Sequence, residues 1–357
     1  MEGYTRFAKP PFCLAMVLAS CCFLAGANTH LGRSLNHTIG SRAWPGEHDL
    51  TPSIFAPGIV STDADEAGGC LSPDGREFYF VVYPPYTTQP DIGLICVSRF
   101  DGRAWSKPQS LPFSGDYLNL PPRISPDGKR LYFASNRPDP AITGDGIWIW
   151  YVERTGDGWS DPKALPSPIN SNRARFNIDP SVASDGTLYF ASHRNGSGIA
   201  IFSAKLVNGV YQEPERLGPE INFAGAYNWQ PYISPDQRFL IYGAQTVDVY
   251  PFKKLPDELI AGGNPYSRTD LYVSQSKNGA WSRARHLEHS INTAAEESYP
   301  FVSADGKTLF FTSERSDFLT PVDPKVTYEG LKGKMKSILN GRGNIFSISA
   351  RALDLDE

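Results

Sequence analysis

The chain has 357 residues, and 62 of them are Gly or Pro, about 17% where roughly 12% is usual. Charged residues make up 20%, aromatic residues 12%, and the formal net charge is -4. A disordered chain would have few aromatic residues and a high net charge, and a helical bundle would not tolerate so many helix breakers. The composition therefore favours an all-β globular protein that is rich in turns.

The first 27 residues have the features of a secretory signal. Basic residues are followed by an apolar stretch at 13–24 and by the small residues Ala25-Gly26-Ala27. We therefore expect export to the periplasm or the extracellular space, followed by a flexible segment at 28–49. Leu18-Ala19-Ser20-Cys21 also resembles a bacterial lipobox, so lipidation of Cys21 is the alternative to cleavage after Ala27.

Only two cysteines, Cys70 and Cys96, follow this signal. The repeat described next places them on the first and third strands of one sheet, roughly 9.5 Å apart. A disulfide requires Cα atoms within about 7 Å. We expect two buried free thiols.

A turn containing Asp recurs five times along the chain, each time before a β-rich run. The turns are at 72–75, 125–128, 184–186, 234–236 and 303–306. Asp-Gly between β-rich runs is the strongest short hairpin signal. Each unit then continues with a third strand and with a final strand predicted to begin at a Gly-aromatic segment, at 102–105, 158–159, 209–211 and 279–281. Four strands per unit predict the blades of a β-propeller.

The fifth unit lacks its final strand, and residues 53–60 before the first unit resemble one. Closing the ring with this segment leaves no open sheet edge. The sequence therefore predicts one five-bladed β-propeller over 50–350, a short tail at 351–357, and a monomer.

These repeats resemble the WD-like repeats of TolB-type propellers. The heptapeptide Leu-Tyr-Phe-Ala-Ser-Asn-Arg at 131–137 carries the resemblance most closely, and the whole resemblance covers about residues 50 to 350. It implies an exported bacterial protein used for binding or scaffolding. The repeat specifies a fold and leaves the activity open.

Counting eight residues back from each turn aspartate gives a polar residue in every unit. These residues are Glu66, Asn119, Asn177, Asn228 and Glu297. Ring closure places Glu297 beside Glu66, with Asp65 and Glu296 preceding them and Asp179 one step off register. Clustered carboxylates raise the pKa of one member or bind a cation, which makes Glu66 and Glu297 a candidate Ca²⁺ site. The alternative is a structural role, in which the polar groups tie neighbouring blades together around channel waters.

The irregular insertions, at 83–91, 246–268 and 316–343, all belong to the same face as this ring. Arg137, Arg194 and Arg315 stand near the starts of loops on that face and are candidates for anchoring loops or for recognising anions. The last insertion has Leu331 and Met335 at helical spacing among lysines, which predicts a short helix. Long loops on one face of a rigid scaffold are the usual place for binding or catalysis.

Two functions from different classes follow. One is an extracytoplasmic binding module that holds a glycan, a peptide or a protein at the loop-bearing mouth of the channel. The other is a carbohydrate-active enzyme, a glycoside hydrolase or lyase, with Glu66, Asp179 and Glu297 as the acid–base set. The negative charge and the expected export disfavour nucleic-acid binding.

Overall fold

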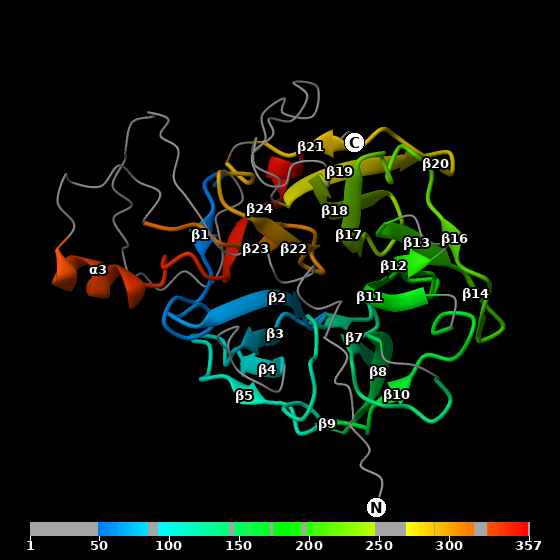
Figure 1. Cartoon of the computed structure of the whole chain (residues 1–357), viewed down its shortest axis with the longest axis horizontal. Coiled ribbons are helices and arrows are strands. Elements are labelled where there is room, and N and C mark those ends of the chain that lie inside the picture. The colour runs from blue at the N-terminus through cyan, green and yellow to red at the C-terminus, as the bar shows by residue number, and fades with distance from the viewer. Residues whose placement is uncertain are drawn as a thin grey trace, which may run out of the picture.

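Five small antiparallel sheets are arranged around a central axis in the computed structural model (Figure 1). The model describes residues 49–84, 92–142, 146–156, 158–171, 174–194, 198–246, 269–288, 290–317 and 327–355. The predicted secretory signal therefore lies outside the described residues, and so do most residues of the predicted insertions. The arrangement of the sheets confirms the five-bladed β-propeller.

Four of the blades are each continuous in sequence. Blade 1 contains β2 (Asp65–Leu71), β3 (Glu77–Tyr83), β4 (Leu94–Arg99) and β5 (Gln109–Ser110). Blade 2 contains β6 (Arg123–Ile124), β7 (Arg130–Ser135), β8 (Trp148–Thr155) and β10 (Lys163–Ala164). Blade 3 contains β11 (Ala174–Val182), β12 (Leu188–Arg194), β13 (Ala200–Ala204) and β16 (Glu215–Arg216). Blade 4 contains β17 (Ala226–Ile233), β18 (Phe239–Thr246), β19 (Asp270–Lys277) and β21 (Arg285–His286).

Blade 5 combines both ends of the chain. It contains β22 (Glu297–Val302), β23 (Thr308–Ser313), β24 (Asn344–Ser349) and the amino-terminal β1 (Ser53–Ile54). β1 pairs with β24 through Ser53 opposite Ser347 and Ile54 opposite Phe346. The predicted closing strand is therefore confirmed, but it is shorter than 53–60 because the chain turns at Ala56, which has a φ of 43°.

The fourth strands lie later in the sequence than we predicted. The Gly-aromatic segments form short extensions of the third strands, as β9 (Gly158–Trp159), β15 (Val210–Tyr211, paired with β14, Leu206–Val207) and β20 (Ala280–Trp281). The outermost strand of each blade follows a few residues afterwards. The prediction was wrong on this point because a second hairpin turn has the same sequence signature as the start of a new strand.

The Asp-containing turns join the first and second strands, as predicted. In blade 1 the Ser72 hydroxyl donates to the Asp74 carboxylate at 2.5 Å, and the Gly75 N–H donates to the Ser72 carbonyl at 2.8 Å. Gly75 has a φ of 71°, in the left-handed region that glycine adopts without strain. Blade 4 has Gln237 there instead, at a φ of 59°, and its side chain bonds Asp185 and Tyr189 of blade 3.

Aromatic side chains fill the junction between blade 5 and blade 1. The Phe55 ring, next to β1, lies 4.7 Å from the Phe78 ring, 5.1 Å from Phe310 and 5.3 Å from Trp105, centroid to centroid. Burial of such large apolar side chains is the main source of stability at a blade junction. Cys70 and Cys96 are buried and free, as predicted.

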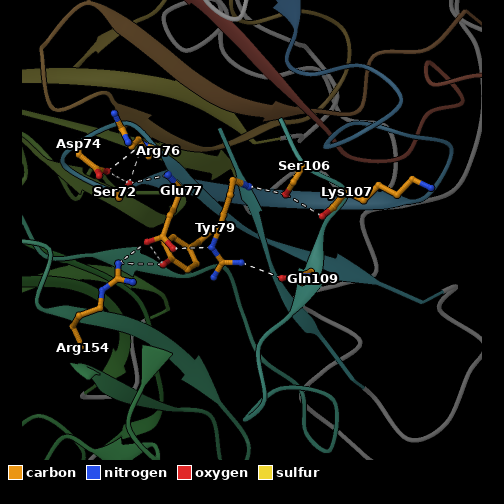
Figure 2. A network of polar contacts seen from close by, with 10 residues as sticks. Ser72, Asp74, Arg76, Glu77, Tyr79, Ser106, Lys107, Gln109 and Arg154 are labelled. Carbon is orange, nitrogen blue, oxygen red and sulfur yellow. Dashed lines mark hydrogen bonds and ion pairs between the residues drawn. The ribbon is translucent and has the colours of Figure 1, made fainter. Parts of the chain in front are cut away.

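A polar network joins blades 1 and 2 near the turn end of the blades (Figure 2). The Glu77 carboxylate accepts hydrogen bonds from Arg154 Nη2 at 2.7 Å, from the Tyr79 hydroxyl at 2.7 Å and from Arg99 Nε at 3.2 Å. The Arg154 guanidinium also lies over the Trp159 ring, 4.1 Å from its centroid. Charge and ring stacking therefore hold the two blades together at this edge.

The predicted short helix is present as α3 (Tyr328–Met335), which lies apart from the sheets in Figure 1. It begins at Thr327, whose side chain accepts a hydrogen bond from the Gly330 N–H, and it buries none of its residues. After β24 the chain forms the 3₁₀ helix η1 (Ala350–Leu353), where Leu353 is buried. In the described part of the chain, no helix is long and apolar enough to cross a membrane.

Candidate functional site

The five polar residues found by counting back from the turns are all buried where the first strands begin. We call Glu66, Asn119, Asn177, Asn228 and Glu297 the loop-facing ring, because their polar groups bond to the loops that connect the blades. The side chains do not gather as one cluster over the channel. Most of their hydrogen bonds stay within one blade and the loop that leads into it, and the Asn119 amide also reaches the Gly93 carbonyl of blade 1.

The two glutamates of this ring have the same local geometry. Glu66 accepts hydrogen bonds from the backbone N–H and the hydroxyl of Thr62, four residues earlier. Glu297 accepts the equivalent bonds from Thr293 at 2.9 and 2.8 Å, and a third from the Ser313 hydroxyl at 2.7 Å. Burial raises the pKa of each carboxyl to about 7. The donors orient both carboxyl groups into the loops.

The three asparagines also bind backbone groups. The Asn119 amide donates to the carbonyls of Gly93 and Tyr117 at 2.8 and 3.0 Å. The Asn177 amide donates to Ile169 at 3.1 Å, and its oxygen accepts from the Ser192 hydroxyl at 2.7 Å. The third member, Asn228, makes longer contacts of the same kind.

The three arginines likewise donate to carbonyls of the inter-blade loops. Arg137 binds Phe113 O at 3.0 Å and Asn119 Oδ1 at 2.9 Å. Arg194 binds Pro168 O at 2.9 Å, and Arg315 binds Ile291 O at 2.6 Å. Arg315 Nε also lies 3.6 Å from a Glu297 oxygen. These contacts are those of loop anchors.

Asp65 and Glu296, which precede the two glutamates, are partly exposed. The Asp65 carboxylate accepts a hydrogen bond from the Gly343 N–H at 3.0 Å. Burial raises the pKa of Asp65, while the Gly343 N–H and the charge of Arg342 act in the opposite direction. Asp65 therefore helps to hold the Gly343 backbone at the loop-bearing end of blade 1.

A second ring, which the sequence did not single out as a set, lies at the channel axis two residues farther along each first strand. We call Gly68, Pro121, Asp179, Gln230 and Tyr299 the channel ring. A Cβ atom on Gly68 would lie 2.2 Å from Pro121 Cβ and 3.2 Å from Tyr299 Cγ, so three blades meet at this glycine. The Gln230 N–H donates to Asp179 Oδ2 at 3.2 Å, and the Tyr299 N–H donates to Gln230 Oε1 at 3.3 Å.

Strained backbone distinguishes the channel ring. Asp179, Gln230 and Tyr299 have φ values of 54°, 54° and 50°, in the left-handed region that side chains other than Gly rarely adopt. The β-ladder is irregular at the same place in their three strands. Each such residue costs about 1 kcal/mol or more, and such strain is concentrated at functional sites.

Arg123 follows Pro121 by two residues, so it lies closer to the Asp-containing turns than the channel ring does. Its guanidinium donates to the Gly69 carbonyl of blade 1 and, at 2.7 Å, to the Pro300 carbonyl of blade 5. Its charge acts on Asp179, which is 7% exposed. A buried arginine from blade 2 thus spans the axis beneath the channel ring.

Asp179 is the one proposed catalytic residue that lies in the channel ring. Burial raises the pKa of its carboxyl to about 7, while the Gln230 N–H and Arg123 act against this rise. Its second oxygen, Oδ1, is buried and has no hydrogen-bond partner in the described structure. A buried acceptor without a donor is unfavourable, and it is satisfied by a water, a proton or a ligand group.

Two tyrosines lie within electrostatic reach of this carboxyl, Tyr83 at the end of β3 and Tyr299 in β22. Burial holds the pKa of both phenols well above the ordinary value, and the charge of Asp179 raises it further in each. Asp65 acts on Tyr83 and Glu296 acts on Tyr299 in the same direction. The phenols of Tyr83 and Tyr299 are therefore electrostatically coupled to Asp179 and to the acidic groups Asp65 and Glu296.

Three further residues with a repeated structural role were missed in the sequence. These residues are Asn170, Asn222 and Asn292. The side-chain amide of each one accepts from the N–H and donates to the carbonyl of a single residue in a third strand, and it also donates to one loop carbonyl. The available signal was an Ile-Asn pair ending five residues after a repeated Leu.

For the candidate Ca²⁺ site, no group of three His, Cys, Asp or Glu side chains suited to a metal occurs among the residues that the structure describes.

Comparison with known proteins finds likeness in solved structures. No family model matches the sequence, and no curated protein matches it. An α-L-arabinofuranosidase from Lactobacillus brevis is 15% identical, with 82% of this chain and 92% of that one covered and a TM-score of 0.47. An endo-arabinanase from Bacillus licheniformis is 14% identical over 82% and 96% of the two chains, with a TM-score of 0.44.

A peptidase from Mycobacterium tuberculosis that hydrolyses puromycin is 13% identical, with 70% of this chain covered and a TM-score of 0.38. This chain spans only 34% of the length of that peptidase. At these identities the likeness is one of fold.

Proposed function

We propose that the protein is an extracytoplasmic ligand-binding β-propeller whose ligand, a glycan, a peptide or a protein segment, is held at the loop-bearing mouth of the channel. The observation that carries the proposal is the buried carboxyl of Asp179, with one oxygen unpartnered and its backbone in the left-handed region. A ligand donor would satisfy this oxygen and offset the strain. The signal predicted at residues 1–27 supports a ligand met outside the cytoplasm.

The loop-facing ring supports binding over hydrolysis. Hydrolysis of a glycosidic bond uses two carboxyl groups on either side of the bond. The carboxyl groups of Glu66 and Glu297 instead accept bonds from their own loops. Of the proposed acid–base set, only Asp179 lies in the channel ring, and its Oδ1 has no hydrogen-bond partner among the described residues.

The test is a thermal-stability screen of the purified protein against neutral, acidic and basic oligosaccharides and against short peptides. A ligand that binds only the folded state raises stability by RT ln(1 + [L]/Kd), about 2.7 kcal/mol at a hundredfold excess over Kd. Asp179→Asn should abolish the shift, whereas Asp74→Asn, at a turn on the other end of blade 1, should keep it. A shift that survives in Asp179→Asn places the ligand elsewhere and contradicts the proposal.

One observation favours the enzymatic alternative. Glu66, Asp179 and Glu297 all have a pKa near 7, the value suited to a general acid or base at neutral pH. Turnover of a defined polysaccharide by the wild-type protein, lost in Glu66→Gln and in Asp179→Asn, would establish this alternative. Binding without turnover would reject it.

A further inference from the structure

The groups around Asp179 indicate which chemical group of the ligand binds in the channel. The inference that follows rests on the proposed function. Oδ2 already accepts the Gln230 N–H at 3.2 Å, and Oδ1 has no partner in the described part of the chain. An ionised carboxylate only accepts hydrogen bonds. A ligand group that pairs with the ionised form of Asp179 therefore brings a donor to Oδ1.

Among the residues that the structure describes, no cationic side chain donates a hydrogen bond to this carboxylate. The charge of Arg123 acts on it, but the Arg123 guanidinium donates its hydrogen bonds to the Gly69 and Pro300 carbonyls, deeper in the channel. A buried carboxylate is stabilised mainly by a charged partner with good hydrogen-bond geometry. The Asp179 carboxylate is therefore near a guanidinium, that of Arg123, whose hydrogen bonds go to backbone carbonyls and not to the carboxylate.

The surroundings on the loop-bearing side suit a small cation. Tyr83 of blade 1 and Tyr299 of blade 5 lie within electrostatic reach of Asp179, and tyrosine rings can attract an ammonium group that comes within about 6 Å of them. Asp65 and Glu296, which act on the same two tyrosines, add negative charge. The combined negative charge of Asp179, Asp65 and Glu296 favours a positive group on this side of the channel ring.

We infer that the ligand inserts a primary ammonium group at the channel ring, where it donates to Asp179 Oδ1 beside Tyr83 and Tyr299. Such a group occurs in a lysine side chain of a peptide and in an amino sugar. The two sources share the same recognition chemistry. They differ in the rest of the ligand, so the experiment keeps them in separate arms.

The experiment measures the affinity of the full-length protein by calorimetry in two arms. One arm uses a lysine-containing peptide and its Nε-acetylated form, and the other uses glucosamine oligomers and N-acetylglucosamine oligomers of equal length. Acetylation removes the positive charge and replaces the three ammonium donors by one amide N–H and an added acetyl group. We expect the amine form of at least one pair to bind tenfold or more tightly than the acetylated form, and the arm that responds identifies the source.

Variants localise the effect. Asp179→Asn should lower the affinity for the amine at least tenfold, and Asp74→Asn should leave it unchanged. Tyr299→Phe keeps the ring and should retain binding, whereas Tyr299→Leu should weaken it several-fold. Circular dichroism confirms that each variant is folded before its affinity is compared.

The lysine arm has a second readout in pH. Asp179 faces Arg123, Tyr83 and Tyr299, none of which changes its charge between pH 6 and 8, so the ionisation of Asp179 controls the affinity there. With the pKa of Asp179 near 7, affinity should rise about tenfold from pH 6 to pH 8 and be flat in Asp179→Asn.

Two negative results are distinguishable. Equal binding of the amine and acetylated forms, or binding of neutral sugars alone, overturns the ammonium inference and leaves the binding function intact. The absence of any Asp179-dependent ligand in these arms and in the broader screen overturns both.

Discussion

The backbone N–H of Gln230 donates a hydrogen bond to the Asp179 carboxylate across the boundary between blades 4 and 3, at 3.2 Å. This is the one hydrogen bond that the carboxyl accepts in the described structure, since the other oxygen is buried without a partner. The protein therefore retains a carboxyl whose charge is poorly compensated until something binds there.

The first prediction concerns the pH dependence of stability. Burial raises the pKa of Asp179 from an ordinary value of 3.8 to about 7, so its stabilising contribution is full below pH 4 and is lost as pH rises through 7. Asp179→Asn removes this loss, and asparagine tolerates the left-handed backbone. The free energy of unfolding of the variant, relative to wild type, should rise by up to about 4 kcal/mol between pH 4 and 8.

Urea denaturation at several pH values measures this difference. Asp74→Asn is the control, because the Ser72 hydroxyl holds the pKa of Asp74 below its ordinary value. The contribution of Asp74 is therefore constant between pH 5 and 8. Parallel curves for wild type and Asp179→Asn would contradict the assignment of a buried, poorly compensated carboxyl.

The second prediction concerns ring closure. Phe55 packs among Phe78, Trp105 and Phe310 where blades 5 and 1 meet. Phe55→Ala leaves a cavity in this cluster and should lower the free energy of unfolding by about 3–5 kcal/mol. Leu50→Ala, at a side chain that is 52% exposed, should change it by less than about 0.5 kcal/mol. A small effect of Phe55→Ala in chemical denaturation would mean that this junction does not hold the ring.

The third prediction concerns the close approach of blades at the axis. Gly68→Ala combines a left-handed φ of 54° with a Cβ that would lie 2.2 Å from Pro121. Gly75→Ala has a similar φ of 71° but no atom within 4 Å. The turn variant should cost about 1–2 kcal/mol from backbone strain alone, and the channel variant at least about 1 kcal/mol more. Equal costs would show that the axis has spare room.

The fourth prediction concerns the network between blades 1 and 2 in Figure 2. Glu77 and Arg154 are mostly buried partners, with side chains 16% and 26% exposed and an N–O distance of 2.7 Å. A double-mutant cycle with Glu77→Gln and Arg154→Met should give a coupling of about 1–2 kcal/mol. The cycle for Asp127 and Lys129, an exposed pair at 3.7 Å, should give a value near zero. Similar values for both pairs would contradict a role of burial.

The fold could be predicted because its signals are local and repeated. A Ser-Pro-Asp-Gly turn such as 72–75 specifies a hairpin by its own hydrogen bonds, whatever surrounds it. The closing strand could be predicted because the fifth unit lacked a fourth strand. The outer strands were misplaced because a Gly-aromatic turn such as β9 signals a reversal of the chain without showing which sheet position comes next.

The candidate site was harder to predict because an irregularity in the first strands changes which side chains face the axis. Regular alternation would place Glu66 and Gly68 on the same side of β2. The shift in register between Ala67 and Cys70 separates them, and the equivalent shift in β11 brings Asp179 to the channel ring. Arg123 carries no repeat signal at all, since its partners are carbonyls from blades 1 and 5.

Because β1 pairs with β24 inside blade 5, the five-bladed ring can be kept while the chain is joined and opened at other places. Ser53 lies opposite Ser347, and the Ser349 N–H donates to the Asp49 carbonyl at 3.2 Å, so the two ends of the described chain are neighbours within one sheet. A circularly permuted gene that links these ends and opens the chain between two other blades would encode the same ring. In such a permutant the fourth strand of blade 5 would come directly after its third strand in the sequence. The blade at which the chain was opened would then be the one that combines strands from both chain ends.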